Sequence, residues 1–262
     1  MSETQHTFVV PVYGETPWLP VTIESLRDQT ALTSIIVTTS APTAALRDLC
    51  NSYGLPLVVR DGTPGIGRDW NFALEQVTSG WVTIAHQDDI YLPRYVEDSL
   101  AAAAADTLLV WSDYRELIED EPRAFGVPLM VKWLMIEAAF FPGRIRLRSR
   151  MRKRLLFGLG DPVCCPSAMI HRERAADFRF AEHLDLDLDW EAWLRVCQLP
   201  GSLAYVRRTN VLHRLHHLSA TTRGIADRKR RHEDEDMFLR MWPRPIARAL
   251  AGVYALCYRF NA

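Results

Sequence analysis

The chain has 262 residues and a nearly balanced charge, with 31 Lys+Arg against 32 Asp+Glu and a formal net charge of −1. Its 48% hydrophobic and 10% aromatic residues suffice for a globular core, which excludes a chain that is disordered throughout. The neutral balance also argues against a general nucleic-acid-binding protein, which would carry a basic excess.

Short apolar runs alternate with segments of helical periodicity over the first hundred residues. The expected strands cover 8–12, 35–37, 57–59 and 81–85, and the expected helices cover 17–29, 43–53 and 65–77. Gly54 follows the second of these helices and is typical of a helix end. Strands and helices that alternate in this way predict an α/β fold, a mostly parallel sheet with helices on both faces.

The pattern is less regular after residue 93. We expect a helix over 93–105 and strands over 108–111 and 167–170. The tail over 236–260 favours a helical segment that is interrupted at 243–245 by Pro-Arg-Pro. The region 115–160 is mixed, with an apolar stretch followed by a run of basic residues.

Cysteine usage and hydropathy bear on the compartment. The five cysteines are an odd number and show no CxxC spacing, which is typical of a reducing environment. The N-terminus has no signal-peptide pattern, and no apolar run reaches the roughly 20 residues that a membrane span needs. We therefore expect a cytoplasmic protein, free or peripheral at the inner face of the membrane.

Two adjacent carboxylates follow the fourth expected strand. In open parallel sheets ligands bind beyond the carboxyl ends of the strands, and His86 to Tyr91 lies at such a place with Asp88 and Asp89 at its centre. A divalent metal that bridges to a phosphate group would neutralise this pair. The simpler alternative is that Asp89 caps a turn or helix and that Asp88 is solvated.

A second acidic group lies between Asp185 and Glu191. Apolar residues recur at helical spacing from Asp189 onward, so that Asp189 is expected to be the N-cap of a helix. The alternative is a general base at the mouth of a pocket.

Histidines and arginines cluster between His213 and Thr221. Such residues bind phosphate oxygens or complete a metal coordination sphere. Because the adjacent His216 and His217 point to different faces, at most one of them is expected to be a ligand, and the remaining histidines are expected at the surface.

Taken together and in this order, these segments resemble a family 2 glycosyltransferase with the GT-A nucleotide-sugar-binding fold. The resemblance runs from about Thr7 to Thr221. Its parts are Val9–Tyr13, Gly67–Ala73, Gln87–Pro93, Leu188–Arg195, Arg214–His216 and Ser219–Thr221.

The resemblance implies transfer of a sugar, with inversion, from a nucleotide diphosphate donor to the hydroxyl of a glycan or lipid-linked acceptor. It implies Asp189 as the catalytic base and a divalent metal, Mn²⁺ or Mg²⁺, held by Asp88, Asp89 and His216. A histidine ligand would favour Mn²⁺. The residues implied in nucleotide-sugar binding are Pro11, Tyr13, Glu15, Thr39, Asn71, His86, Gln87 and Asp88.

The resemblance also implies a domain organisation. Residues 1–222 would form the GT-A domain, with a nucleotide-sugar-binding half over 1–113 and an acceptor-binding half over 114–222, and 223–262 would form a helical extension. The sequence departs from the family in two places. Thr38-Thr39-Ser40 stands where acidic residues usually contact the base or ribose, and His86 stands where the metal motif usually begins with aspartate.

Two other classes of function compete with this interpretation. A sugar-phosphate nucleotidyltransferase should carry a Gly-rich, basic phosphate loop after its first strand, where this chain has Tyr13-Gly14-Glu15-Thr16. A non-catalytic sugar- or membrane-binding module would need neither Asp88 nor Asp189. The basic run from Arg144 to Arg154 is either a solvated face or a contact with an anionic membrane surface.

Overall fold

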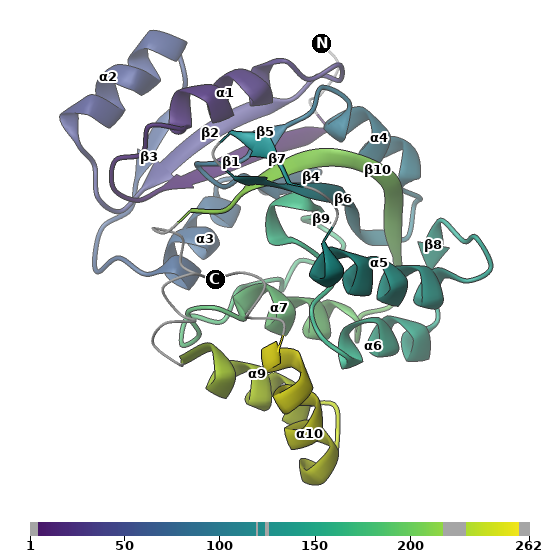
Figure 1. Cartoon of the computed structure of the whole chain (residues 1–262). Helices are drawn as coiled ribbons and strands as arrows, with labels where there is room; N and C mark the ends of the chain where they lie inside the picture. The colour runs from purple at the N-terminus through teal and green to yellow at the C-terminus, as the bar shows by residue number, and fades with distance from the viewer. Residues whose placement is uncertain (1–4, 119, 124–125, 217–228, 257–262) are drawn as a thin grey trace.

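The structure is a computed structural model that describes residues 5–118, 120–123, 126–216 and 229–256. Its strands form one ten-stranded mixed sheet (Figure 1). They are β1 (His6–Val12), β2 (Ser34–Thr39), β3 (Leu57–Val59), β4 (Trp81–Ile84), β5 (Ile90–Tyr91), β6 (Thr107–Ile118), β7 (Glu121–Pro122), β8 (Arg146–Leu147), β9 (Ala168–His171) and β10 (Ser202–Arg214).

The order along the sheet is β3-β2-β1-β4-β9-β6-β10-β5, with β7 beside β6 and β8 beside β10. The first four strands of this order are parallel, and so are β6 and β10. The antiparallel β9 lies between the two parallel groups. The expected α/β class and mostly parallel sheet are therefore confirmed.

Helices cover both faces of this sheet (Figure 1). They are α1 (Leu19–Arg27), α2 (Ala44–Tyr53), α3 (Ile66–Glu75), α4 (Tyr95–Ala102), α5 (Val127–Phe140), α6 (Arg150–Gly158), α7 (Leu188–Val196), α9 (Lys229–Leu239) and α10 (Arg244–Tyr254), with a short 3₁₀ turn, η1 (Cys165–Ser167). Helices α1, α2 and α4 pack on one face, and α3, α5, α6 and α7 pack on the other.

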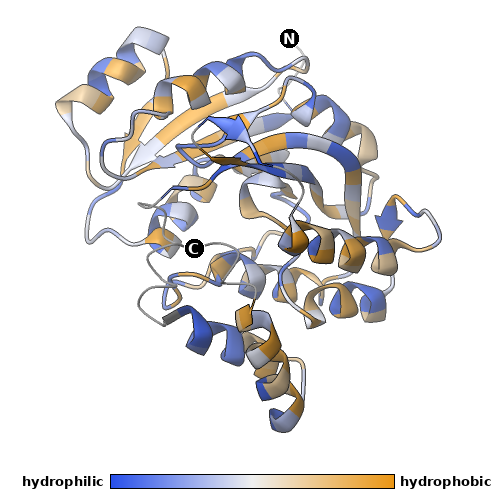
Figure 2. Ribbon diagram, viewed as in Figure 1, coloured by the Kyte–Doolittle hydropathy of each residue, from blue (hydrophilic) through white to orange (hydrophobic). Residues whose placement is uncertain are grey.

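The alternation of side chains along β1 explains the two cores. Phe8 and Val10 belong to the cluster under α1, whereas Val9 points to the opposite cluster. Figure 2 shows the resulting hydrophobic character along β1 and β2, which are covered on both sides. The capping signals of α2 also act as expected, since the Thr43 hydroxyl accepts the Leu46 N–H at 3.1 Å and Gly54 adopts φ 63°.

Helices α9 and α10 lie below α7 in Figure 1 and extend the hydrophobic core to which α7 belongs. Met237 and Phe238 are fully buried, and the Phe238 ring meets Trp190 of α7 edge to face at 5.0 Å. The tail is thus broken near Pro243 as expected, although α9 begins earlier than the periodicity indicated. Phe260 lies outside the described residues.

Two features differ from the sequence expectations. The long strand β10 was not predicted, and α7 begins earlier than expected, because its N-cap is Asp187 and Asp189 lies inside the first turn. The expectation of Asp189 as N-cap is therefore wrong. The described part of the chain contains no helix that is long and apolar enough to cross a membrane.

Candidate functional site

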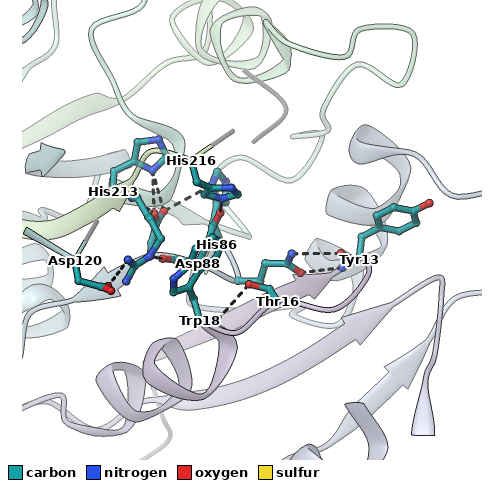
Figure 3. A network of polar contacts seen from close by, with 11 residues as sticks. Tyr13, Thr16, Trp18, His86, Asp88, Asp120, His213 and His216 are labelled. Carbon is teal, nitrogen blue, oxygen red and sulfur yellow. Dashed lines mark hydrogen bonds and ion pairs between the residues drawn. The ribbon is translucent and has the colours of Figure 1, made fainter. Parts of the chain in front are cut away.

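Strand β10 brings the two histidine-containing segments of the chain together. Residues 86–89 follow β4, and β5 comes directly after them. Because β5 pairs antiparallel with Val211 and Leu212 of β10, the residues after this pairing face Asp89. The sheet thereby places His213 and His216 beside the two aspartates (Figure 3).

Asp89 is the fully buried centre of this cluster. Its carboxylate accepts a hydrogen bond from the backbone N–H of Arg214 at 2.9 Å and lies 2.9 Å from Nδ1 of His213. His86 Nδ1 lies 3.7 Å from the same carboxylate. The three ligand atoms of His86, Asp89 and His213 lie within 4.8 Å of one another, so that one ion can contact all of them.

Asp88 pairs with a different histidine. His216 Nε2 lies 2.6 Å from Asp88 Oδ2, and the His216 ring packs on Trp18 at 4.4 Å between centroids. The Arg214 guanidinium lies over the Trp18 ring, 5.1 Å from its centroid. It also donates to the Asp88 carbonyl at 3.0 Å and pairs with Asp120. These contacts fix the loop after β4 against the end of β10.

The electrostatics of the cluster favour a cation. Burial raises the pKa of Asp88, but the hydrogen bond from His216 and the nearby His86 outweigh it and lower that pKa overall. Burial lowers the pKa of His213, yet the Asp89 carboxylate outweighs this and raises it to about 9. A positive charge is therefore stabilised beside Asp89.

The donor set fits a divalent metal ion. Burial lowers the pKa of His86, which keeps the imidazole neutral as a metal ligand must be, and its buried Nε2 has no hydrogen-bond partner among the described residues. Mixed imidazole and carboxylate donors suit Mn²⁺ and similar ions. The sequence predicted Asp88, Asp89 and His216 as ligands, whereas the described geometry groups Asp89 with His86 and His213. Because the Asp89 carboxylate raises the pKa of His213, this histidine must release its proton before it can bind an ion.

Asp189 lies in the first turn of α7, close enough to this cluster for its charge to raise the pKa of His86. It is partly buried, and its carboxylate accepts the backbone N–H of Trp190 at 2.9 Å. Burial raises its pKa, while Arg230, Lys132 and His86 act in the opposite direction. Burial is the main cause of the raised pKa of the nearby Asp161, and the charge of Asp189 raises that pKa further.

Helix α9 holds the segment that leads to Asp189. The buried Glu233 carboxylate accepts three backbone N–H groups, from Asp185, Leu186 and Asp187, at 2.9 to 3.2 Å. The N-cap residue Asp187 makes no capping hydrogen bond with its own side chain. A carboxylate from a distant helix therefore satisfies the donors before α7.

The residues predicted at the nucleotide end lie after β1 and β4. Gln87 and the backbone of Tyr13 exchange two hydrogen bonds, at 3.0 and 3.3 Å (Figure 3). Tyr13 and Glu15 are exposed, and Pro11 is partly buried on β1. The structure thus brings Pro11, Tyr13 and Gln87 to one edge, where their contact with a nucleotide sugar stays a prediction.

A carboxylate from another element lies at the end of β2, where the residues Thr38-Thr39-Ser40 offer none. Asp69 of α3 accepts the Ser40 hydroxyl at 3.0 Å and pairs with Arg60 at 2.8 Å. The neighbouring Thr39 is buried, and its hydroxyl accepts the Ala41 N–H. An acidic group is therefore supplied to this edge from another element.

Asn71 is buried and has its amide engaged by the loop before α7. It accepts the Phe180 N–H at 2.7 Å and donates to the Phe180 carbonyl at 3.0 Å and to Glu182 at 3.2 Å. These bonds give Asn71 a positioning role for that loop. Its predicted contact with the donor is not tested by them.

Some residues of this region were not identified from sequence. His213 was expected at the surface but contacts Asp89, so that expectation is wrong. Burial along β10 comes in runs, at 202–205 and 210–211, rather than alternating, so that no period-two pattern marks this strand or the place of His213. Lys132 of α5 also lies near Asp189 and His213, and no local motif marks it. Ser219, Ala220 and Thr221 lie outside the described residues.

The sequence profile described as Glycosyl transferase family 2 matches residues 7–178. The chain belongs to this family. The resemblance stated from the sequence is thereby confirmed, and the protein is a glycosyltransferase. No curated protein sequence matches the chain.

Solved structures share the fold at low sequence identity. S. aureus TarS 1–349 in complex with UDP-GlcNAc is 14% identical, with a TM-score of 0.64, over 95% of this chain and 70% of that chain. The mannosyltransferase PcManGT of Pyrobaculum calidifontis, in complex with GDP-Man and Mn²⁺, is 15% identical, with a TM-score of 0.65, over 98% and 70%.

A third similar structure is glucosyl-3-phosphoglycerate synthase of Mycobacterium tuberculosis, in complex with Mn²⁺, UDP-Glc and phosphoglyceric acid. It is 18% identical, with a TM-score of 0.55, and the match covers 87% of this chain and 77% of that chain. These likenesses confirm the GT-A fold.

Proposed function

We propose that this protein transfers a sugar from a nucleotide diphosphate donor to an acceptor hydroxyl with inversion. The observation that carries the proposal is an Asp-His cluster that lies within electrostatic reach of a partly buried carboxylate, Asp189, since the charges of His86 and Asp189 act on each other's pKa. A single displacement needs charge compensation for the leaving diphosphate and a base on the other side of the reacting carbon.

Asp189 is the proposed base. It would accept the proton of the acceptor hydroxyl as that oxygen attacks the sugar. Its position in the first turn of α7, fixed by Glu233 of α9, supports this role. Asp161, the partly buried carboxyl near Asp189, is the alternative base, and the substitutions Asp189→Asn and Asp161→Asn distinguish the two.

Asp88, Asp89 and a histidine are the proposed metal-holding residues. When bound, a divalent ion supplies charge compensation for the donor diphosphate. Two ligand sets share Asp89, one with Asp88 and His216 and one with His86 and His213. The Mn²⁺ found with PcManGT and with the M. tuberculosis synthase supports Mn²⁺ as the ion to test first.

We further propose that residues 1–113 contribute most of the donor site and that 114–222 contribute the acceptor site, with 223–262 as a supporting extension. Tyr13, Glu15, Thr39, Asn71 and Gln87 belong to the proposed donor side. The complexes of similar proteins with UDP-GlcNAc, GDP-Man and UDP-Glc support a nucleotide-sugar donor.

The experiment is a thermal-shift screen of UDP, GDP and related nucleoside diphosphates with Mn²⁺ and with EDTA. A ligand that binds only the folded state raises the melting temperature according to RT ln(1 + [L]/Kd), so that even a millimolar binder is detected. We expect one diphosphate to stabilise the protein in Mn²⁺ and EDTA to abolish the effect. Stabilisation by none of them, together with no donor hydrolysis, would contradict the proposal.

Contact with an anionic membrane is a second proposal, for location rather than catalysis. Helices α5 and α6 expose Met130, Leu134, Met151 and Leu155 beside the basic run 144–154, and apolar and basic residues together suit an anionic lipid surface. Arg148, although paired with Asp106, stays 65% exposed. We expect salt-sensitive binding to anionic but not to neutral liposomes, weakened when Arg146, Arg148 and Arg150 are changed to Ser. Equal binding to both liposomes would contradict it.

A further inference from the structure

A cavity lies between β6 and α5 and is not used by the residues proposed above. Its volume is about 320 Å³. Aromatic side chains of Trp111, Tyr114 and Trp133 form part of its wall, and Arg115, Lys132 and Thr209 add polar groups. A concave, mostly apolar site with a few convergent polar groups is the usual form of a small-molecule pocket.

Lys132 is the unusual member of this wall. Its ammonium donates to the neutral Tyr114 hydroxyl at 3.3 Å and lies 5.7 Å from the centre of that ring. Within the described part of the chain, no carboxylate lies within ion-pair distance of it. Burial lowers the pKa of Lys132, but Tyr114 and Asp161 are among the groups that outweigh it and raise that pKa overall, so that Lys132 stays a cation that can attract an anion entering the cavity.

Two further side chains in the wall bear on which ligand the cavity suits. Trp111 is buried in its wall, and the indole Nε1 has no hydrogen-bond partner among the described residues. Asp113, the carboxyl in the same wall, accepts the Tyr205 hydroxyl at 2.6 Å, and burial raises its pKa. Asp113 is thus engaged with Tyr205, and the carboxyl that acts on the pKa of Lys132 is Asp161. The groups that remain suit a ligand with acceptor oxygens.

The cavity adjoins both sides of the proposed reaction site. The Tyr114 ring lies 6.2 Å from the His213 ring, and the Lys132 charge affects the pKa of Asp189 as well as that of His213. The proposed donor residues follow β1 and β4, whereas this cavity lies along β6. A group bound here would therefore belong to the acceptor.

We propose that this cavity binds a phosphate or carboxylate group of the acceptor through Lys132, an inference that rests on the proposed transfer to an acceptor hydroxyl. The acceptor is then an anionic hydroxyl compound. Trp133 of α5, 41% exposed, offers an aromatic face beside the anion for the ring that carries the hydroxyl.

The test uses the full chain in EDTA and two probes, inorganic phosphate and acetate, titrated by calorimetry. In wild type we expect one of them to bind, and the tighter one identifies the acceptor's anionic group. Lys132→Met and Lys132→Gln should weaken that binding about tenfold or more, because a charge-assisted contact is lost. Lys132→Arg keeps the charge and should stay within a few-fold of wild type.

Arg47→Met is the matched control. Arg47 is exposed on α2, so that this substitution removes the same charge far from the cavity. No anion binding in wild type, unchanged binding in both neutral variants, or equal weakening in Arg47→Met would overturn the proposal. A nucleoside diphosphate with Mn²⁺ is titrated separately. Failure of the proposed function would appear in that titration, and failure of the anion site would appear with phosphate and acetate.

Discussion

The carboxyl groups on the two sides of the candidate site have different surroundings. Asp88 and Asp89 each lie within 3 Å of a histidine nitrogen, and the backbone N–H of Arg214 adds a further donor. Among the described residues, Asp161 and Asp189 have no cation within ion-pair distance, and burial raises both pKa values. The surroundings of Asp88 thus favour its ionised form, whereas burial favours the protonated form of Asp161 and Asp189.

This difference separates two tasks within the candidate site. A carboxylate that stays ionised among histidines suits a cation, whereas a carboxyl with a raised pKa is suited to take up a proton during a reaction. The two sides also depend on different elements. The loop after β4 and the end of β10 build the first, and α7 with α9 builds the second.

Asp189→Asn should give the largest effect, because it removes only the proposed proton acceptor. We expect turnover to fall by two to four orders of magnitude, the usual range for a lost general base, while nucleoside diphosphate binding in Mn²⁺ is kept. Single-turnover kinetics and calorimetry check the two parts. The control is Asp185→Asn, in the same acidic segment, which should retain turnover. Wild-type turnover in Asp189→Asn, with a loss in Asp161→Asn, would assign the base to Asp161.

Asp88→Asn tests the other side and should affect binding rather than proton transfer. We expect the affinity for the nucleoside diphosphate in Mn²⁺ to fall about 10- to 100-fold, as is typical when a metal site is perturbed, with little response left to EDTA. Calorimetry with and without Mn²⁺ measures this. The control is Asp120→Asn, which removes an exposed carboxylate that pairs with Arg214. This variant should keep the response to Mn²⁺ and EDTA. An unchanged EDTA response in Asp88→Asn would contradict the assignment of Asp88.

The two sides were not equally predictable from sequence. Asp88 and Asp89 follow a short apolar strand, and local periodicity locates the end of such a strand. His213 could not be placed in the same way, because its position depends on the pairing of β5 with β10, which joins residues far apart in the chain. Tertiary pairing of this kind leaves little local signal.

Residues that act through packing were the hardest to identify. Glu233 lies in a helix that the sequence indicated only in part, and its three backbone partners lie more than 45 residues away. Lys132 lies in a region, 115–160, where apolar and basic residues follow each other without a clear period. In both cases the side chain matters because of what the fold brings next to it.

Glu233→Ala should weaken the base side without touching the metal side. Three backbone N–H groups before α7 would lose a charged acceptor, and unsatisfied buried donors cost about 1–3 kcal/mol. We expect the free energy of unfolding, from urea titration, to fall by that amount, and turnover to fall more than metal-dependent nucleotide affinity. Glu235→Ala breaks a surface pair with Arg248 and should cost less than ~1 kcal/mol. Equal losses in the two variants would show that Glu233 does not hold the segment.

Arg230→Met should give the smallest effect on turnover, a shift in its pH dependence, although it also destabilises the fold by removing the partner of the buried Asp187 carboxyl. Burial raises the pKa of Asp189, and Arg230 partly opposes this, so that removing the guanidinium should raise that pKa further. The proposed base is active only when ionised, and a higher pKa therefore moves the acidic limb of the kcat profile to higher pH, while the rate well above that limb changes little. Arg231→Met, which removes an exposed neighbouring cation, is the control and should leave the limb in place. A limb that stays in place in Arg230→Met, or one that moves to lower pH, would show that the acidic limb does not report Asp189.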